Sequence, residues 1–311
     1  MSVKLFDTAE VQAFLKEAAG LNQDGGNPRT KEITLRIISD LFKTIEDLDI
    51  TPDEFWAGIA YLNQLGQSQE AALLSPGLGF DRYLDMRMDA IDEQLGVKGG
   101  TQRMIEGPLY VAGAPVEQGY ARLDDGSDEA GHLLLMHGTV YGTDGNPLPN
   151  AQVEVWHANT KGWYSHFDPT GEQQPFNMRR TIIADDQGRY KFRSILPAGY
   201  GCPPDGPTQQ LLNQLGRHGN RPAHLHFFVS AEGHRKLTTQ INIDGDPYVN
   251  DDFAYAVHDD LVPPVTEVTD EARMKEENME APFAEIVFDI TLTPLVDGED
   301  NQAVERPRLV G

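Results

Sequence analysis

Two histidines separated by a single residue, His224 and His226, are the side chains in this sequence best suited to chemistry. They lie in the segment RPAHLHFFVS (221–230), whose apolar residues predict a β-strand. Because side chains alternate along a strand, both imidazoles would share one face, with Cα atoms roughly 7 Å apart. That spacing lets both rings bind one metal ion. The alternative is that one histidine bonds to backbone while the other faces solvent.

A histidine pair at this spacing is also typical of cupins, which use a downstream glutamate as a third ligand. The sequence fits that pattern poorly, because Glu232 comes too late in the chain and Gly219 is one position out of place. A facial triad of two histidines and one carboxylate would need an acid from elsewhere, and none stands out by position.

The residues from Ile105 onward follow a hydrophobic period of two, and Gly, Pro and Asn separate the segments. The segments that predict strands are HLLLMHGTVYG (132–142), AQVEVWHAN (151–159), TIIAD (181–185), GRYKFRSI (188–195), AHLHFFVS (223–230), KLTTQINI (236–243) and EIVFDITLT (285–293). Short strands without regularly interleaved helices predict an antiparallel β-sandwich. An acidic stretch at 269–280 predicts one helical interruption.

The first hundred residues follow a helical period instead. Asn27-Pro28 and Thr51-Pro52 are typical helix starts, each with a capping residue before a proline. Apolar residues then recur at intervals of three and four, and Ser75-Pro76-Gly77 interrupts the pattern. We therefore predict an α+β fold with two regions, an all-helical region at 1–104 and a β-sandwich region at 105–311.

The composition narrows the possible partners and compartment. Asp and Glu outnumber Lys and Arg by 49 to 25, and the net charge of −24 argues against a nucleic-acid partner. No apolar run is long enough to span a bilayer, so we expect no membrane insertion. The single cysteine, Cys202, cannot form an intrachain disulfide, and the first residues lack the layout of an export signal. We therefore expect a cytoplasmic protein.

Three blocks of sequence, in this order and spacing, resemble the signature of the intradiol ring-cleavage dioxygenases. They are HGTVYGTDGNPLPNAQVEVWHANTKGWY (137–164), DDQGRYKFRSILPAGYG (185–201) and GNRPAHLHF (219–227). Two further segments, LLSPGLGF (73–80) and IEGPLYV (105–111), resemble the catechol 1,2-dioxygenase branch of that family. The resemblance covers nearly the whole chain, including the helical region.

The resemblance implies one Fe(III) ion per subunit, with four ligands: Tyr164, Tyr200, His224 and His226. Two phenolates and one hydroxide would balance the ferric charge, and the hard cation would keep the phenolates deprotonated. The resemblance also implies that Tyr200 leaves the iron and accepts a substrate proton. Arg221 would stabilise negative charge on the substrate, with Gln240 as its polar partner.

By the same resemblance, the substrates are catechol and O2, and the product is cis,cis-muconate, in the beta-ketoadipate pathway of aromatic compound catabolism. The slot for the ring would be lined by Arg221 and by Leu73, Pro76, Ile105, Pro108, Leu109, Phe253 and Ala254. The wide apolar stripe of the second predicted helix favours a homodimer joined through the N-terminal helices. The family further implies a phospholipid bound at that helical interface.

Two other interpretations stay open. The stretch 138–200 also resembles transthyretin-like and carboxypeptidase-regulatory sandwich modules, which do not catalyse. An extradiol-type Fe(II) oxygenase would use a carboxylate triad. The pairing of Tyr164 with two histidines favours the ferric enzyme. A red colour, from charge transfer between tyrosinate and Fe(III), would distinguish it from both alternatives.

Overall fold

The computed structural model describes residues 3–128, 131–296 and 309–310. The chain divides into two compact units, here named the helical unit (Met1–Ser68) and the sandwich unit (Gln69–Gly311). The predicted boundary after residue 104 would group two more helices with the helical unit, and it stays a prediction.

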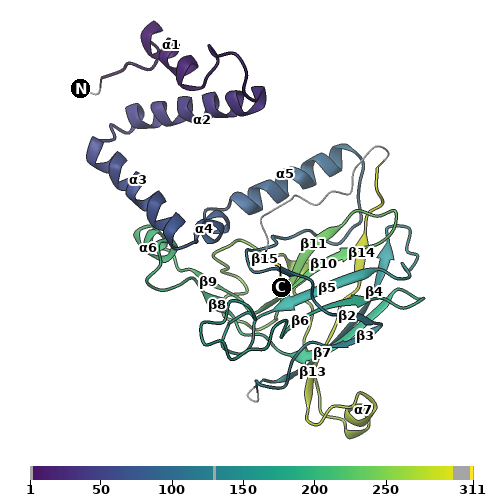
Figure 1. Cartoon of the computed structure of the whole chain (residues 1–311). Coiled ribbons are helices and arrows are strands. Elements are labelled where there is room, and N and C mark those ends of the chain that lie inside the picture. Colours follow the sequence, from purple (N-terminus) through teal and green to yellow (C-terminus); the bar gives the residue numbers. More distant parts are fainter. Residues whose placement is uncertain (1–2, 129–130, 297–308, 311) are drawn as a thin grey trace. The chain divides into compact units, whose positions relative to one another are not determined.

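Each helix of the helical unit begins at a residue whose side chain caps it. Its helices are α1 (Ala9–Ala18), α2 (Pro28–Asp47) and α3 (Pro52–Gln67) (Figure 1). Thr8, Asn27 and Thr51 precede them, and each side chain accepts a hydrogen bond from a backbone N–H of the first turn. At Thr51 the cap is reciprocal, because Glu54 Oε2 accepts the N–H of Thr51. The helix starts predicted at Asn27 and Thr51 are therefore confirmed.

Helix α2 keeps an apolar face exposed. Three of its side chains and that of its C-cap residue lie at intervals of four and seven residues and form one stripe, here named the α2 stripe: Ile33, Ile37, Leu41 and the C-cap Leu48. These side chains are between 44% and 72% exposed. An amphipathic helix normally buries such a stripe against another surface.

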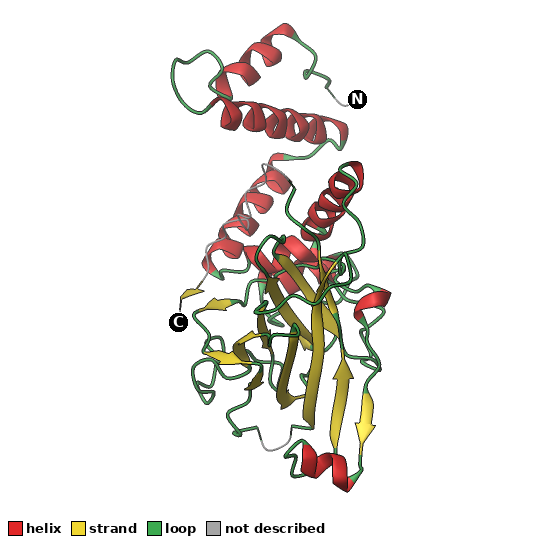
Figure 2. Cartoon of the chain, turned by 90° about the vertical axis from the view of Figure 1, so that its right-hand side faces the viewer, coloured by secondary structure: helices red, strands yellow, loops and turns green. Residues whose placement is uncertain are grey.

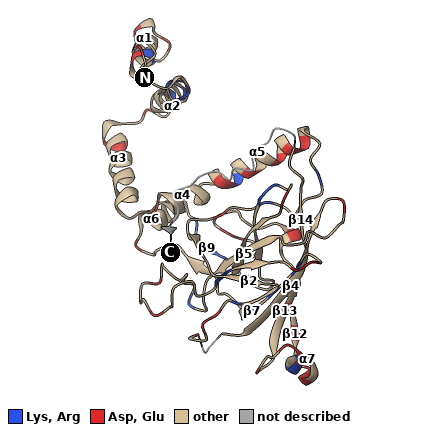
Figure 3. Cartoon of the chain, turned by 45° about the vertical axis from the view of Figure 1, so that its right-hand side comes forward, with Lys and Arg blue, Asp and Glu red and all other residues tan. Residues whose placement is uncertain are grey.

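The helices of the sandwich unit are α4 (Ala71–Gly77), α5 (Phe80–Gln94), α6 (Pro207–Gln214) and α7 (Glu271–Glu276), with a 3-10 turn at Asp259–Leu261. Acidic residues recur along α5, and the ribbon of Figure 3 is red at their positions. α4 was not expected, because the sequence placed a break at 75–77. Pro76 lies inside this helix, where it removes an N–H that would otherwise bond within the last turn, and the helix ends one residue later. None of the described helices is both long and apolar enough to cross a membrane.

Two sheets make up most of the sandwich unit. The five-stranded sheet has the order β11 (Leu237–Asn242), β10 (His224–Ser230), β5 (Gln152–His157), β6 (Arg179–Ile183) and β2 (Val116–Gln118). The six-stranded sheet has the order β12 (Thr266–Val268), β13 (Phe283–Val287), β4 (Leu133–Gly142), β7 (Arg189–Ile195) and β3 (Tyr120–Arg122), and β14 (Ile290–Leu292) also pairs with β4. Two short pairs complete the set: β1 (Val111–Ala112) with β15 (Leu309–Val310), and β8 (Tyr200–Gly201) with β9 (Asn220–Arg221).

The main core lies between the two sheets, which form the layers seen in Figure 2. On β10, Leu225, Phe227 and Val229 belong to the same buried cluster as Met136 of β4 and Phe192 of β7. Because side chains alternate along a strand, the remaining residues of β10 lie on the opposite face of the sheet.

These layers confirm the predicted α+β fold with N-terminal helices. The sheets are mixed, however, and not wholly antiparallel. The central pairs of β10 with β11 and β5, and of β4 with β7, are antiparallel. The pairs β2–β6, β3–β7, β13–β4 and β14–β4 are parallel. The parallel partners are distant in the chain, so no tight hairpin forces them to be antiparallel.

Candidate metal centre

Four polar side chains converge on the outer face of the five-stranded sheet: Tyr164, Tyr200, His224 and His226. The His224 Nε2 atom lies 3.3 Å from Tyr164 Oη, 3.4 Å from Tyr200 Oη and 3.0 Å from His226 Nε2. The two tyrosine rings meet edge to face, with centroids 5.6 Å apart.

Strand alternation brings the two histidines together. His224 and His226 occupy the first and third positions of β10, on the side away from the main core. Their rings are nearly perpendicular, with centroids 4.6 Å apart. Both side chains are buried because a second, smaller cluster of aromatic and apolar residues covers this face: Trp156, Ala158, Tyr164 and Phe228, with Leu109, Tyr110 and Tyr200 packed against them.

A tight loop after β5 turns Tyr164 toward the histidines. Asn159 closes this loop: its N–H donates to Trp163 O at 2.9 Å, and its Oδ1 accepts the Trp163 N–H at 3.0 Å. Gly162 adopts a φ of +77°, and a Cβ at this position would come within 2.8 Å of Tyr200 Cβ. Glycine permits both the left-handed backbone and this close approach, so the Gly-Trp-Tyr sequence places Tyr164 beside Tyr200.

Arg221 connects the centre to its surroundings. It pairs with Tyr200 across β8 and β9, and its Nη1 lies 3.1 Å from His224 Nε2. Its Nη2 donates to Asp252 Oδ2 at 3.1 Å and to Gln240 Oε1 at 2.8 Å. Burial alone would lower the pKa of Arg221, but Asp252 and Tyr200 raise that pKa by more. The guanidinium is therefore a permanent cation beside the four converging groups.

Gln240 holds its amide in one orientation. Its Nε2 donates to Ala256 O at 2.7 Å and to Asn242 Oδ1 at 3.1 Å. Its Oε1 is thereby left facing Arg221. The structure thus brings together the arginine and the glutamine that the resemblance paired.

Burial sets the protonation states of the centre. Burial first, and then the charge of Arg221, lowers the pKa of His224 far below its ordinary value. Burial and the neighbouring His224 lower the pKa of His226 in the same way. Both imidazoles are therefore neutral at pH 7. Burial, with a smaller effect of Tyr200, raises the pKa of Tyr164 well above its ordinary value, so this phenol keeps its proton unless a strong positive charge binds.

The donor atoms fit a ferric ion. The Nδ1 of His224 lies 2.6 Å from the carbonyl oxygen of Pro222, so Nδ1 carries the proton and Nε2 offers its lone pair to the centre. Two neutral imidazole nitrogens and two phenol oxygens form a set suited to a hard trivalent cation, which stabilises phenolates. The residues present are therefore compatible with a mononuclear iron site.

The residues predicted to line an apolar slot lie on several segments of the sandwich unit. Leu109 packs against the same small cluster as Tyr164. Ile105, Phe253 and Ala254 belong to the main core cluster, and Pro76 precedes Gly77, where an added Cβ would lie 3.1 Å from the Phe253 ring. Leu73 is half-buried and Pro108 is exposed. That these residues together line one substrate slot stays a prediction.

Sequence reasoning missed three residues that support the centre. Asp252 pairs with Arg221, Asn242 bonds to Gln240, and the Trp156 ring stacks on that of His226. Trp156 lies directly opposite His226 in the register of β5 and β10. No spacing in the sequence reveals Asp252 or Trp156, because their contacts depend on pairing between distant segments. Asn242 follows Gln240 by two residues on β11, so the strand period of two could have indicated that contact.

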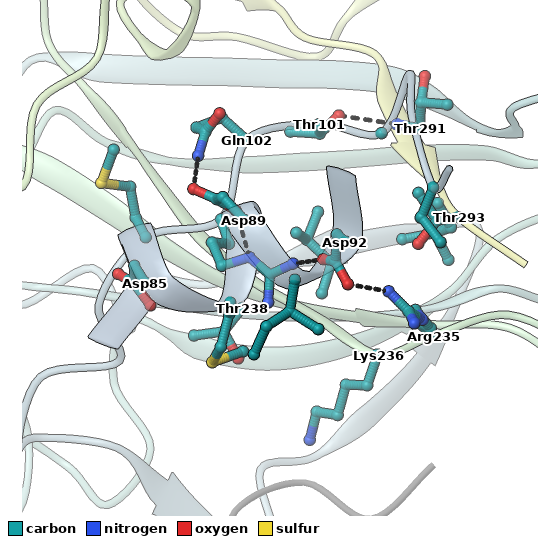
Figure 4. Close-up of a pocket in the computed structure, with 18 of the residues that line it drawn as sticks. Asp85, Asp89, Asp92, Thr101, Gln102, Arg235, Lys236, Thr238, Thr291 and Thr293 are labelled. Atoms are coloured by element: carbon teal, nitrogen blue, oxygen red, sulfur yellow. Dashed lines mark hydrogen bonds and ion pairs between the residues drawn. The ribbon is translucent and has the colours of Figure 1, made fainter. Parts of the chain in front are cut away.

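A separate cavity of about 850 Å³ lies between α5, the segment 97–106 and strands β11 and β14 (Figure 4). An ion-pair network forms one wall, in which Asp92 pairs with both Arg103 and Arg235, and Asp89 pairs with Arg103. Ile105 also lines this cavity, whereas the four converging residues lie outside its lining.

Comparison with known proteins agrees with the resemblance. A family model described as Dioxygenase matches residues 105–294, and one described as Catechol dioxygenase N terminus matches residues 27–96. The chain is 69% identical to a catechol 1,2-dioxygenase of Acinetobacter baylyi, over 99% of each chain. A solved catechol 1,2-dioxygenase from Acinetobacter sp. ADP1 covers 99% of this chain and all of its own, with a TM-score of 0.97 and 69% identity. One from Pseudomonas arvilla C-1 covers 99% of each chain, with a TM-score of 0.94 and 51% identity.

The chain belongs to the intradiol ring-cleavage dioxygenase family, and it is an oxidoreductase. Within that family it is similar to the catechol 1,2-dioxygenase branch, as its sequence predicted. Membership implies a non-haem iron cofactor.

Proposed function

We propose that this protein uses O2 to cleave catechol between its two hydroxylated carbons and releases cis,cis-muconate, as a step of the beta-ketoadipate pathway. The observation that carries the proposal is the convergence of two tyrosine oxygens and two imidazole nitrogens on one point. The name catechol 1,2-dioxygenase, borne by a relative 69% identical over the full length, supports the same substrate.

The proposed cofactor is one Fe(III) ion per subunit, held by Tyr164, Tyr200, His224 and His226. When bound, such an ion supplies Lewis acidity that holds the substrate as a catecholate and prepares its ring for reaction with O2. The chain contributes two neutral nitrogen donors and two phenols, which give up their protons when the cation binds.

The two tyrosines differ in burial, and this supports different roles. Tyr164 is 1% exposed and packs in the small aromatic cluster, whereas Tyr200 is only half-buried, in the two-residue strand β8. Tyr200 therefore has more freedom to move. We assign its Oη as the base that accepts a catechol proton, while Tyr164 remains a fixed ligand.

Arg221 is placed to stabilise negative charge on the substrate. Its cation lies 3.1 Å from His224 Nε2, and Asp252 and Gln240 hold the guanidinium in position. Because this group is 4% exposed, water screens its charge weakly, and its effect on a bound anion is large. The apolar ring of catechol would rest on the predicted slot, with Leu109 beside the tyrosines.

The reaction is tested by mixing purified, iron-loaded protein with catechol in air and identifying the product. Muconate supports the proposal. A semialdehyde would mean extradiol cleavage, and the absence of product would favour a sandwich module without catalysis.

The ligand assignment is tested with Tyr164→Phe, which should lower iron retention and kcat/KM by more than about 100-fold. The loss of even an outer partner of a metal ligand lowers affinity or activity by about 10–100-fold. The matched control is Tyr190→Phe, because Tyr190 is also 1% exposed and its hydroxyl bonds to Phe288 O. That variant should keep both iron and activity. Full activity in Tyr164→Phe would contradict the assignment.

The assembly and location belong to the same proposal. The exposed α2 stripe supports a homodimer joined through helices of the 1–104 region. A phospholipid at that interface rests on the family resemblance alone. The free, buried thiol of Cys202 is consistent with the cytoplasm.

A further inference from the structure

The two histidines of the centre differ in how their rings are held. The Nδ1–H of His224 donates to Pro222 O, which fixes the plane of that ring. His226 must also carry its proton on Nδ1 if its Nε2 is to bind a metal ion. Yet within the described part of the chain, the buried Nδ1 of His226 has no hydrogen-bond partner. Metal-binding histidines are normally oriented by such a bond, so another contact must orient this ring.

Trp156 makes that contact. Its indole lies parallel to the His226 imidazole, with an interplanar angle of 7° and centroids 4.9 Å apart. The two residues are direct partners in the register of β5 and β10, so the sheet itself holds the rings face to face. Trp156 is 1% exposed, and its Nε1 also has no hydrogen-bond partner among the described residues. Flat contact area, and not hydrogen bonding, is therefore what this indole provides.

The indole is itself held in place. Tyr110 packs edge-on against Trp156, with centroids 5.0 Å apart, and Phe228 does so at 4.8 Å. At another edge of His226, Gly107 has a φ of +70°, and a Cβ at this position would lie 3.6 Å from His226 Cε1. The backbone at Gly107 thus approaches the His226 imidazole closely.

We propose that Trp156 is a positioning residue, whose stacked indole fixes the plane of the His226 imidazole and keeps Nε2 directed at the other three donor atoms. The proposal rests on the proposed function, because it treats His226 as an iron ligand. It assigns the two histidines different means of orientation, a hydrogen bond for one and a stacked ring for the other.

The test compares Trp156→Leu with Trp156→Phe. Leucine fills much of the space without a flat face, whereas phenylalanine keeps one. Iron affinity, measured by competition with a chelator, should fall about 10–100-fold in Trp156→Leu and stay within about threefold of the parent in Trp156→Phe. The tyrosinate-to-Fe(III) absorption band and the EPR spectrum should change in the leucine variant and be largely restored in the phenylalanine variant.

The matched control is Phe227→Leu, which loses a fully buried aromatic ring from the same strand as His226, on the opposite face of the sheet. If packing alone matters, this variant and Trp156→Leu should lose iron equally. We expect Phe227→Leu to lower the melting temperature of the metal-free protein while iron affinity stays within about twofold, since it leaves the stacked pair and the rings around it in place. Should Trp156→Leu fail to fold, Trp156→Met replaces it, because methionine fills irregular gaps without a flat ring.

Unchanged iron affinity and spectra in Trp156→Leu or Trp156→Met would overturn the proposal, as would equal iron loss in Phe227→Leu. These outcomes are distinct from failure of the proposed function. If the proposed function failed, the parent protein itself would bind no ferric ion or form no muconate. If only the positioning proposal failed, the parent would be red and active, and replacing the indole would have no effect on iron binding.

Discussion

The helical unit and the sandwich unit treat their apolar residues in opposite ways. The two sheets of the sandwich unit enclose an apolar core, and residues such as Leu134, Phe192 and Phe227 have no exposed surface, although α5 of the same unit keeps side chains such as Leu84 about half exposed. In the helical unit, the α2 stripe and side chains such as Phe55 are more than 40% exposed. Buried apolar surface is the main source of folding free energy. The sandwich unit can therefore stabilise its own centre, whereas the α2 stripe contributes little to folding and is available for the proposed dimer interface.

The largest expected effect on stability comes from replacing a phenylalanine by alanine in the sandwich unit, compared with the same replacement in the helical unit. Phe192→Ala should lower the free energy of unfolding by about 3–5 kcal/mol, because it removes a fully buried ring and leaves a cavity. Phe55→Ala removes a ring that is 44% exposed and should lower it by less than about 1 kcal/mol. Urea denaturation of both variants in dilute solution measures the difference. Equal losses would mean that a partner buries Phe55 as deeply as the core buries Phe192.

A charge in the α2 stripe should act on assembly. Ile37→Glu places a carboxylate at the centre of the stripe, and we expect the dimer to dissociate about 100-fold more readily, or about 2.7 kcal/mol. Sedimentation of the variant across a range of concentrations measures this change. Arg36→Glu is the control, because it places the same side chain about 100° around the helix axis from Ile37 and outside the stripe. If both variants dimerise as tightly as the parent, the stripe is not the interface.

The smallest expected effect concerns a buried carboxylate of the sandwich unit. Burial raises the pKa of Asp85 on α5 from 3.8 to about 6, although the charge of Arg103 opposes the shift. The folded state therefore holds this proton more tightly than the unfolded state, and the free energy of unfolding falls as pH rises from about 4 to about 6. Above that range the charged group destabilises the fold.

Asp85→Asn should therefore raise the free energy of unfolding at pH 8 by about 1–2 kcal/mol, since partial exposure reduces the full effect of the shift. The gain should vanish below about pH 4. Asp40→Asn is the control in the helical unit, where Asp40 forms an exposed pair with Arg36 and the change should be within about 0.5 kcal/mol. Denaturation at several pH values checks both, and a gain that is independent of pH would contradict the burial explanation.

Local patterns in the sequence predicted much of the fold. Capping residues at Asn27 and Thr51 mark helix starts, because a cap depends on residues within one turn. The period of two predicted the strand that holds His224 and His226 on one face. The short helix α4 was missed because Pro76 normally ends a helix, and here it does so only after two turns. The parallel strand pairs were missed because they join segments that no turn connects.

By itself, the sequence determined the family and the class of fold, and it predicted which residues bind a metal ion, because local periodicity and ordered motifs depend on neighbours along the chain. Only the tertiary structure decided that Asp252 pairs with Arg221, that Trp156 stacks on His226, and that Gly162 lets one tyrosine approach the other. Those contacts arise where strands from distant parts of the chain come into register, and register is set by the packing of the whole sandwich.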